Sequence, residues 1–319
     1  MTLKAGTYNK DDIKTLEGIE AIRLRPGMYI GSTGPEGVKQ ITLEIISNAV
    51  DEYLNGYCTE VRVSVEGNNT VTISDNGRGV PFGKAKDGTE TLENIFTKLH
   101  TGAKFDSSGK TGYNTSGGMN GVGAKATNAL SSFFSVTSMR DGQIATMIFE
   151  KGKRKDFQVK KSNNNDTGTC VVFIPDEEIF KEGIDLDYDS LRKQLKELAY
   201  LSPGLKFIFS YKTKPVEEIV SKNGILDYIQ DLNKKDAITS IFHAEATEDR
   251  IGVKLAMVYN NTYNDTYRLY TNSIPNSGGT HLTGFRTALT QCMNEYAKEN
   301  KFLKDKDNNL LSCYNLSNS

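Results

Sequence analysis

Residues 37–55, GVKQITLEIISNAVDEYLN, decide the fold, because they predict a two-faced helix. At about 100° per residue, the apolar side chains share one broad arc: Leu43, Ile45, Ile46, Ala49 and Val50. A narrow polar stripe lies opposite, formed by Glu44, Ser47, Asn48 and Asp51. A helix of this kind covers a core with one face and offers polar groups on the other.

The polar stripe has the residue types of a hydrolytic site. Glu44 and Asn48 are one helical turn apart, and Asp51 follows near the second turn. A carboxylate in this place can orient a water molecule and take its proton. An amide oxygen one turn later is a hard ligand that suits Mg²⁺. The alternative interpretation, favoured for the stripe alone, is a solvated helix face.

A second motif, Asp75–Pro81 (DNGRGVP), follows a predicted hairpin made of VRVSVEG, the turn NN and TVTIS. A carboxylate at a strand end can accept a hydrogen bond from an adenine amino group, and the glycines allow close approach. An Asx-type turn with glycine at positive φ explains the motif equally well.

A third motif, residues 116–123 (SGGMNGVG), opens a predicted helix. Backbone N–H groups at a glycine-rich helix start bind phosphate. No strand immediately precedes the loop, and it lacks a GK[ST] ending, so it is neither a Rossmann nor a Walker loop. A fourth motif, Thr167-Gly168-Thr169, precedes a predicted strand and indicates nothing alone.

The composition limits the class of protein. The 319 residues suffice for two domains, and 37% hydrophobic with 25% charged content describes a folded, soluble chain. No apolar run reaches the length of a membrane span, and no signal peptide is present, so a cytoplasmic location is expected. Four scattered cysteines predict neither a disulfide framework nor a zinc site. The basic run 151–161 is expected on an exposed strand pair, with nucleic-acid contact as the alternative.

The remaining pattern completes the expected order of elements. Residues 83–123 form a long irregular segment typical of a lid, with a short helix at TLENIFTKL. Strands are expected at FSVTSMR, QIATMIFEKGK and GTCVVFIPD, a helix at 191–201 and a strand at PGLKFIFSYK. A second region should hold strands at IGVKLAMVYN and TYRLYTNSI and a helix over 284–300.

The order and spacing of the four motifs resemble those of the GHKL ATPase superfamily. Within it, four stretches resemble type II topoisomerase B subunits of the gyrase and topoisomerase IV kind: Arg25–Gly31 (RPGMYIG), Asp75–Pro81 (DNGRGVP), Leu99–Phe105 (LHTGAKF) and Gly278–Phe285 (GGTHLTGF). The resemblance runs from about Tyr8 to about Leu311. It implies an α+β fold, in which a mixed sheet is covered by helices on one face and followed by an incomplete α/β transducer domain.

The resemblance also implies roles for individual residues. Glu44 would be the general base, Asn48 would bind Mg²⁺, and Asp75, with Thr169 through water, would recognise adenine. Gly118, Met119, Asn120, Gly121, Val122 and Gly123 would cradle the phosphates, and Lys104 in the lid would add positive charge. Further ATP-site residues would be Asp51, Glu52, Arg78, Gly79, Pro81 and Tyr113, with Arg78 pairing with Glu52. Arg140 would lie at the rim where aminocoumarin drugs bind.

The implied organisation has three parts: a dimerisation arm over 1–17 with Tyr8 and Ile13, an ATPase domain over 18–215 and a partial transducer over 216–319. ATP would close a homodimer gate, with a topoisomerase A subunit and DNA as partners through other regions. Two departures matter: Asn120 stands where bacterial members usually have histidine, and no candidate for the transducer lysine exists past Lys306. The alternative function is therefore an ATP-dependent dimerisation or regulatory module, truncated or phage-encoded, with little hydrolysis.

Overall fold

The computed structural model describes residues 18–99, 121–233, 237–249, 251–262 and 265–302. These residues belong to two compact units, which divide between Ser221 and Lys222. The predicted arm over 1–17 and most of the predicted lid lie outside the described residues. No described helix has the length and apolar character needed to cross a membrane.

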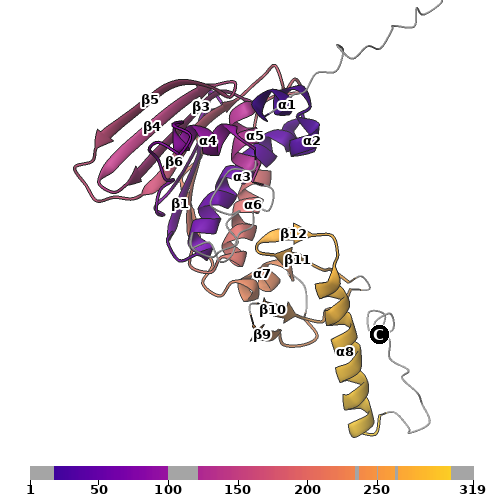
Figure 1. Cartoon of the computed structure of the whole chain (residues 1–319). Coiled ribbons are helices and arrows are strands. Elements are labelled where there is room, and N and C mark those ends of the chain that lie inside the picture. Colours follow the sequence, from indigo (N-terminus) through magenta and orange to yellow (C-terminus); the bar gives the residue numbers. More distant parts are fainter. Residues whose placement is uncertain (1–17, 100–120, 234–236, 250, 263–264, 303–319) are drawn as a thin grey trace, which may run out of the picture. The chain divides into compact units, whose positions relative to one another are not determined.

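Eight strands of the first unit form one sheet in the order β5-β4-β3-β6-β2-β1-β7-β8 (Figure 1). β1 pairs antiparallel with β2 but parallel with β7, so the sheet is mixed, as the sequence predicts. The strands are β1 Glu60–Val65, β2 Val71–Asp75, β3 Ser131–Arg140, β4 Gln143–Glu150, β5 Lys153–Lys161, β6 Gly168–Pro175, β7 Lys206–Tyr211 and β8 Glu217–Ile219.

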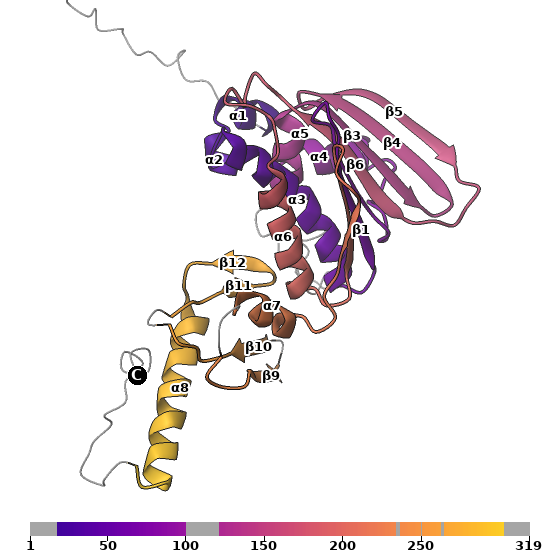
Figure 2. The ribbon, with the colours of Figure 1, turned by 180° about the vertical axis from the view of Figure 1, so that it is seen from behind.

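The helices of the first unit lie on one face of this sheet, as both views show (Figures 1 and 2). This confirms the predicted layer arrangement. The helices are α1 Gly18–Leu24, α2 Gly27–Ile30, α3 Pro35–Leu54, α4 Thr91–Thr97, α5 Gly123–Ala129 and α6 Tyr188–Leu201. α3 is the predicted amphipathic helix; α1 and α2 were not predicted as helices.

The core lies between the helices and the sheet. Alternate residues of β1 are buried, namely Val61, Val63 and Val65, because successive side chains of a strand point to opposite faces. Phe134 and Phe173 from β3 and β6 are fully buried. Burying such a side chain contributes about 1.5–3 kcal/mol, so the strands hold the helical layer in a fixed place.

The first unit ends later than the sequence places it. The sequence sets the domain boundary after residue 215, whereas β8 pairs with β7 through Phe207–Ile219, Ile208–Glu218 and Phe209–Glu217. β8 is thus the last strand of the first sheet, and the ion pair between Arg192 and Glu217 joins it to α6 at 2.6 Å. β8 has only three residues, which are too few to show the alternation of apolar and polar residues that predicts a strand.

The second unit contains the elements α7 Ile225–Leu232, β9 Phe242–Glu248, β10 Ile251–Met257, β11 Leu269–Thr271, β12 Ile274–Asn276 and α8 Thr280–Glu299. β9 pairs antiparallel with β10, and β11 with β12. The sequence predicts one strand over TYRLYTNSI, but positive φ at Asn272 and Ser273 folds it into a hairpin. α8 begins four residues before the predicted start at Gly284. α7 and β9 were not predicted.

Candidate functional site

Asp75 is the last residue of β2, opposite Thr169 in β6. Its Oδ1 accepts hydrogen bonds from the backbone N–H of Gly77 (2.8 Å) and of Thr169 (3.4 Å). Its Oδ2 accepts no hydrogen bond from the residues that the structure describes. Two N–H groups therefore fix the carboxylate and leave one oxygen able to accept a bond from a ligand.

Burial sets the electrostatics of this strand end. The pKa of Asp75 is raised to about 6: desolvation is the largest cause, the N–H of Gly77 opposes it, and the nearby Glu52 charge adds to it. Burial, with the Asp75 charge second, also raises the pKa of the Cys58 thiol to about 11 and that of Cys170. Asp75 is thus a strong acceptor when ionised, since little water competes for it.

Two glycines let three strand ends meet at Asp75. A Cβ on Gly168 would lie 2.1 Å from the Asp75 carbonyl oxygen, and a Cβ on Gly79 would lie 2.4 Å from the Met139 carbonyl oxygen. Gly79 also has φ +76°, which other residues rarely adopt. The resemblance implies that Gly79 is an ATP-site residue. The close approach of Gly168 to Asp75 could not be predicted, because the sequence marks it only by the triplet Thr167-Gly168-Thr169.

We expect Gly79→Ala to lower the free energy of unfolding by about 1–3 kcal/mol, because it adds a steric clash to backbone strain. The matched control is Gly83→Ala, where φ is +103° and nothing lies within 4 Å of the added Cβ. Urea unfolding of both variants separates the clash from the strain. If both variants lost the same free energy of unfolding, the close approach of Gly79 to Met139 would contribute nothing to stability.

Glu52 and Arg78 form an ion pair beside Asp75. The guanidinium donates from Nε to Oε2 (3.0 Å) and from Nη2 to Oε1 (2.9 Å), and the Arg78 backbone N–H donates to Oε2 (3.1 Å). Arg78 also lies over the Tyr57 ring, 3.9 Å from its centroid. The pairing implied by the resemblance is present, and it ties the turn after β2 to α3.

The Glu44 side chain, which comes from α3, lies against the start of α5, where the glycine loop ends. A Cβ on Gly123 would lie 1.8 Å from Glu44 Oε2, so a side chain at position 123 would displace the Glu44 carboxylate. Gln40, one turn earlier in α3, donates to Glu44 Oε1 at 2.7 Å. Thr127 in α5 donates to the Ile41 carbonyl at 2.9 Å and holds the two helices together. Gln40 was not singled out in the sequence, although its four-residue spacing from Glu44 is a usable signal.

The polar stripe of α3 is only partly exposed. Asn48 is exposed, and its Nδ2 donates to the Glu44 carbonyl at 3.0 Å. Asp51 is only 1% exposed and Glu52 8%, so the alternative interpretation, a solvated helix face, does not hold at Asp51. At Glu52 the reason is tertiary: the turn after β2 packs on this side chain, since a Cβ on Gly77 would lie 3.0 Å from Glu52 Cβ.

α3 therefore brings two motifs to one side of the unit. Glu44 meets Gly123, and Glu52 meets Arg78, eight residues or about 12 Å further along the helix. Arg140, at the end of β3, donates from Nη1 to the Gly79 carbonyl at 3.1 Å, which places it beside the same turn.

The remaining predicted site residues are described only in part. Gly121 and Val122 precede α5, and Pro81 is exposed. The other predicted site residues lie outside the described ones: Tyr8, Ile13, Lys104, Tyr113, Gly118, Met119 and Asn120.

Comparison with known proteins decides which family has this arrangement. Residues 33–179 match the family model of histidine kinase-, DNA gyrase B- and HSP90-like ATPases, and residues 224–312 match that of DNA gyrase B. The crystal structure of the 43K ATPase domain of Thermus thermophilus gyrase B, in complex with an aminocoumarin, is 34% identical with a TM-score of 0.76. The match covers 91% of this chain and 76% of that one. The chain belongs to the DNA gyrase B family.

Relatives within the gyrase B family come from both gyrase and topoisomerase 4. The DNA gyrase B protein of Streptococcus pyogenes serotype M1 is 41% identical over 315 residues, which is 96% of this chain and 48% of that protein. The DNA topoisomerase 4 B protein of Staphylococcus aureus is 40% identical over 314 residues, which is 96% of this chain and 47% of that protein. The chain spans about half the length of the curated relatives it matches.

Proposed function

We propose that this chain binds ATP and hydrolyses it, as the ATPase region of a type II topoisomerase of the gyrase B kind. One observation carries the proposal: α3 holds Glu44 against Gly123 near the middle of the helix and Glu52 against Arg78 near its C-terminal end. The distance between these points suits an elongated ligand with its base at Asp75 and its phosphates at the glycine loop. Membership of the gyrase B family supports this orientation.

In this proposal Asp75 selects the base. Its Oδ2 accepts from the adenine amino group, while Gly77 and Thr169 hold Oδ1 in place. The Glu52–Arg78 pair keeps the turn rigid, and Arg140 lies at its outer rim. An aminocoumarin would occupy the same place, since the related Thermus thermophilus domain was solved with one.

Glu44 is the proposed general base. Gln40 holds one carboxylate oxygen, and the other faces the start of α5, so the group is oriented before any substrate arrives. A pre-oriented base within reach of a water molecule typically contributes about 10²–10⁴-fold to rate. Water attacks the γ-phosphorus, the bond to the bridging oxygen breaks, and Glu44 takes the proton of the water.

The donor set next to Glu44 fits Mg²⁺. Asn48 is exposed beside the Glu44 carboxylate, and oxygen donors with room for water molecules are what this cation prefers. Asn48 would hold the ion, which when bound offsets the negative charge of the phosphates. The hydrogen bond from Asn48 Nδ2 to the Glu44 carbonyl fixes which way the amide turns.

The coupled roles extend the proposal. The arm over 1–17, with Tyr8 and Ile13, would exchange between two copies of the chain when ATP binds, and the second unit, from residue 222 onward, would be part of a transducer. Lys104 and Tyr113 would reach the nucleotide from the lid, and Gly118, Met119 and Asn120 would complete the phosphate loop. A topoisomerase A subunit and DNA would be partners of the whole protein in the cytoplasm.

The proposed function is tested by a nucleotide titration and a steady-state phosphate-release assay on the 319-residue chain, with and without DNA. We expect ATP to bind and to be hydrolysed only with Mg²⁺ present. Binding without turnover would instead support an ATP-dependent dimerisation module. No ATP binding at millimolar concentration would overturn the assignment.

The raised pKa of Asp75 makes ATP binding sensitive to pH. The ionised form accepts from adenine, and it becomes the minority below about pH 6. We therefore expect the ATP dissociation constant to be flat above pH 7 and to rise toward tenfold per unit below pH 6. Asp75→Asn is the control, because the titration of the nucleotide phosphates affects both proteins equally. The same pH slope in both proteins would contradict the role of Asp75.

A further inference from the structure

β5 is a free edge of the eight-stranded sheet, and both views show it at the end of the sheet away from α3 and α6 (Figures 1 and 2). All its residues except Phe157 are exposed. The β4–β5 hairpin, residues 143–161, has two acidic residues and six basic ones, namely Lys151, Lys153, Arg154, Lys155, Lys160 and Lys161. The whole chain has 39 basic and 40 acidic residues, so this excess of positive charge is local.

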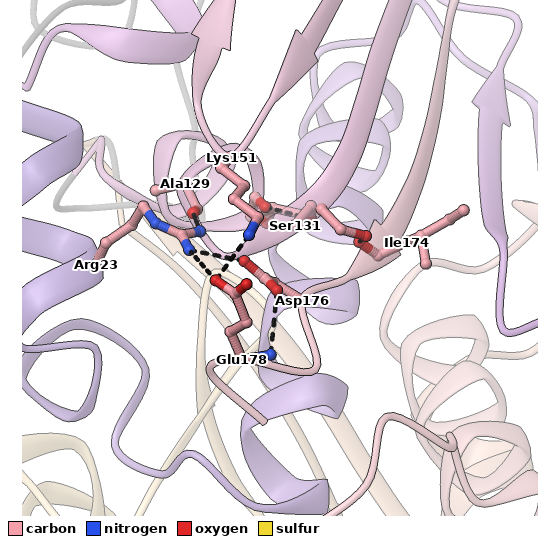
Figure 3. Close-up of polar contacts among 9 residues, drawn as sticks. Arg23, Ala129, Ser131, Lys151, Ile174, Asp176 and Glu178 are labelled. Carbon is pink, nitrogen blue, oxygen red and sulfur yellow. Dashed lines mark hydrogen bonds and ion pairs between the residues drawn. The ribbon is translucent and has the colours of Figure 1, made fainter. Parts of the chain in front are cut away.

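Half of the hairpin's cations are already paired. Lys151 contacts Glu178 at 2.7 Å, beside the pair that Arg23 forms with Asp176 at 2.7 Å (Figure 3). Arg154 contacts Glu93, and Lys155 contacts Glu150, each at 2.8 Å. These pairs are all partly exposed, and pairs of this kind contribute only about 0–1 kcal/mol.

The other three cations, Lys153, Lys160 and Lys161, have no ion pair among the described residues. Asp156, whose carboxylate accepts from the Phe157 backbone N–H and from Gln158 Nε2, each at 2.8 Å, offsets one of these three positive charges and leaves two. The edge therefore has a net positive field that the neighbouring protein does not neutralise.

The geometry of the edge suits an extended polyanion. Lys153 and Lys161 are eight residues apart, or about 26 Å along a strand. Lys160 lies opposite Ile144 and Lys161 opposite Gln143, so the two side chains leave on different faces and flank the edge. At the Lys153 end, a cavity of about 650 Å³ is lined by four cations, Arg23, Lys151, Lys153 and Lys155, and by two acids, Glu20 and Glu150.

We propose that the β5 edge, defined by Lys153, Lys160 and Lys161 with the adjoining cations, binds the phosphate backbone of duplex DNA. A span of about 26 Å corresponds to about eight base-pair steps of 3.4 Å, which offers each lysine a phosphate. The contact reads no sequence, because lysines bound to phosphates carry no base information. It uses none of the residues assigned to ATP, so it does not depend on the proposed function.

Exposed lysines on an edge strand also have a simpler use, which is to prevent the strand from pairing with another chain. Substitution by glutamate distinguishes the two roles. Glutamate keeps the edge charged and blocks pairing, but it repels phosphate. A protective edge predicts no change in DNA affinity for the triple variant Lys153→Glu, Lys160→Glu, Lys161→Glu, whereas the DNA proposal predicts a loss.

The experiment measures fluorescence anisotropy of a labelled 20-base-pair duplex with the full chain, without nucleotide, over a range of salt concentrations. We expect the triple variant to bind more than tenfold more weakly, and the triple Lys→Gln variant at the same positions to lower the slope of log K against log salt by about three. The matched control changes three exposed lysines elsewhere, which have no ion pair among the described residues, to glutamine: Lys181, Lys193 and Lys222.

Besides an unchanged DNA affinity of the triple glutamate variant, two outcomes would overturn the proposal. One is an equal loss of affinity in the control variant, which would show a general charge effect. The other is equal competition by polyglutamate of matched charge, which would assign the edge to an acidic protein partner. Elution of each variant at the volume of the parent chain in gel filtration shows that folding is retained.

Discussion

Glu44→Gln is expected to bind ATP within a few-fold of the parent chain and to lose about 10²–10⁴-fold in turnover. Glutamine has the same shape and can still pair with Gln40, so the contact with Gly123 survives. What disappears is the acceptor for the proton of the attacking water. Titration with a non-hydrolysable ATP analogue measures binding, and phosphate release measures turnover.

Gln40→Ala is the companion variant, because it leaves the base in place and removes the group that orients it. We expect a smaller fall in turnover than in Glu44→Gln, with ATP affinity unchanged. Turnover of Glu44→Gln within a few-fold of the parent chain would mean that another group takes the proton. A joint loss of binding and turnover would instead give Glu44 a structural role beside Gly123.

Asp75→Asn is expected to weaken ATP binding by about 10–100-fold, with little change in the apparent size or fold of the chain. The amide NH₂ would face the adenine amino group, so two donors would meet in a site with little water. Leaving a buried polar group unsatisfied costs about 1–3 kcal/mol, which sets the size of the effect. Isothermal titration with ATP and GTP measures it, and the parent should prefer ATP by about tenfold or more.

Asp141→Asn is the matched control for Asp75→Asn. Its carboxylate is 79% exposed and contacts Arg140 at 3.0 Å, so the same chemical change occurs where water replaces the lost charge. We expect its ATP affinity to stay within about twofold. Equal affinity of the parent chain for ATP and GTP would rule out base recognition by Asp75. An aminocoumarin should also bind Asp75→Asn more weakly if it occupies the same place.

The parts of the fold that could be predicted are those with a repeating pattern. α3 follows from its apolar arc, and β1 and β2 follow from alternation around an Asn-Asn turn. α1 and α2 have only seven and four residues, so they are too short to show a repeating apolar pattern in the sequence. β9 is exposed along its whole length, so no buried face marks it in the sequence.

The candidate site divides in the same way. Glu44, Asn48 and Asp75 stand at motif positions, so residue type and spacing point to them. The close approach of Gly168 to Asp75 depends on pairing between β2 and β6, nearly a hundred residues apart, and local sequence does not contain it. The burial of Glu52 has the same cause, because Gly77 and Arg78, which contact it, come from the turn after β2.

The parallel pairing of β1 with β7, where Val61 lies opposite Phe207, has a consequence for synthesis. A ribosome adds about 5–20 residues per second, so β1 emerges on the order of ten seconds before its partner. During that interval the nascent hairpin exposes a valine-rich edge that can pair with other polypeptides. The first unit therefore cannot pair β1 with β7 co-translationally until residue 211 has left the exit tunnel, and slow translation of this stretch should increase its dependence on holding chaperones.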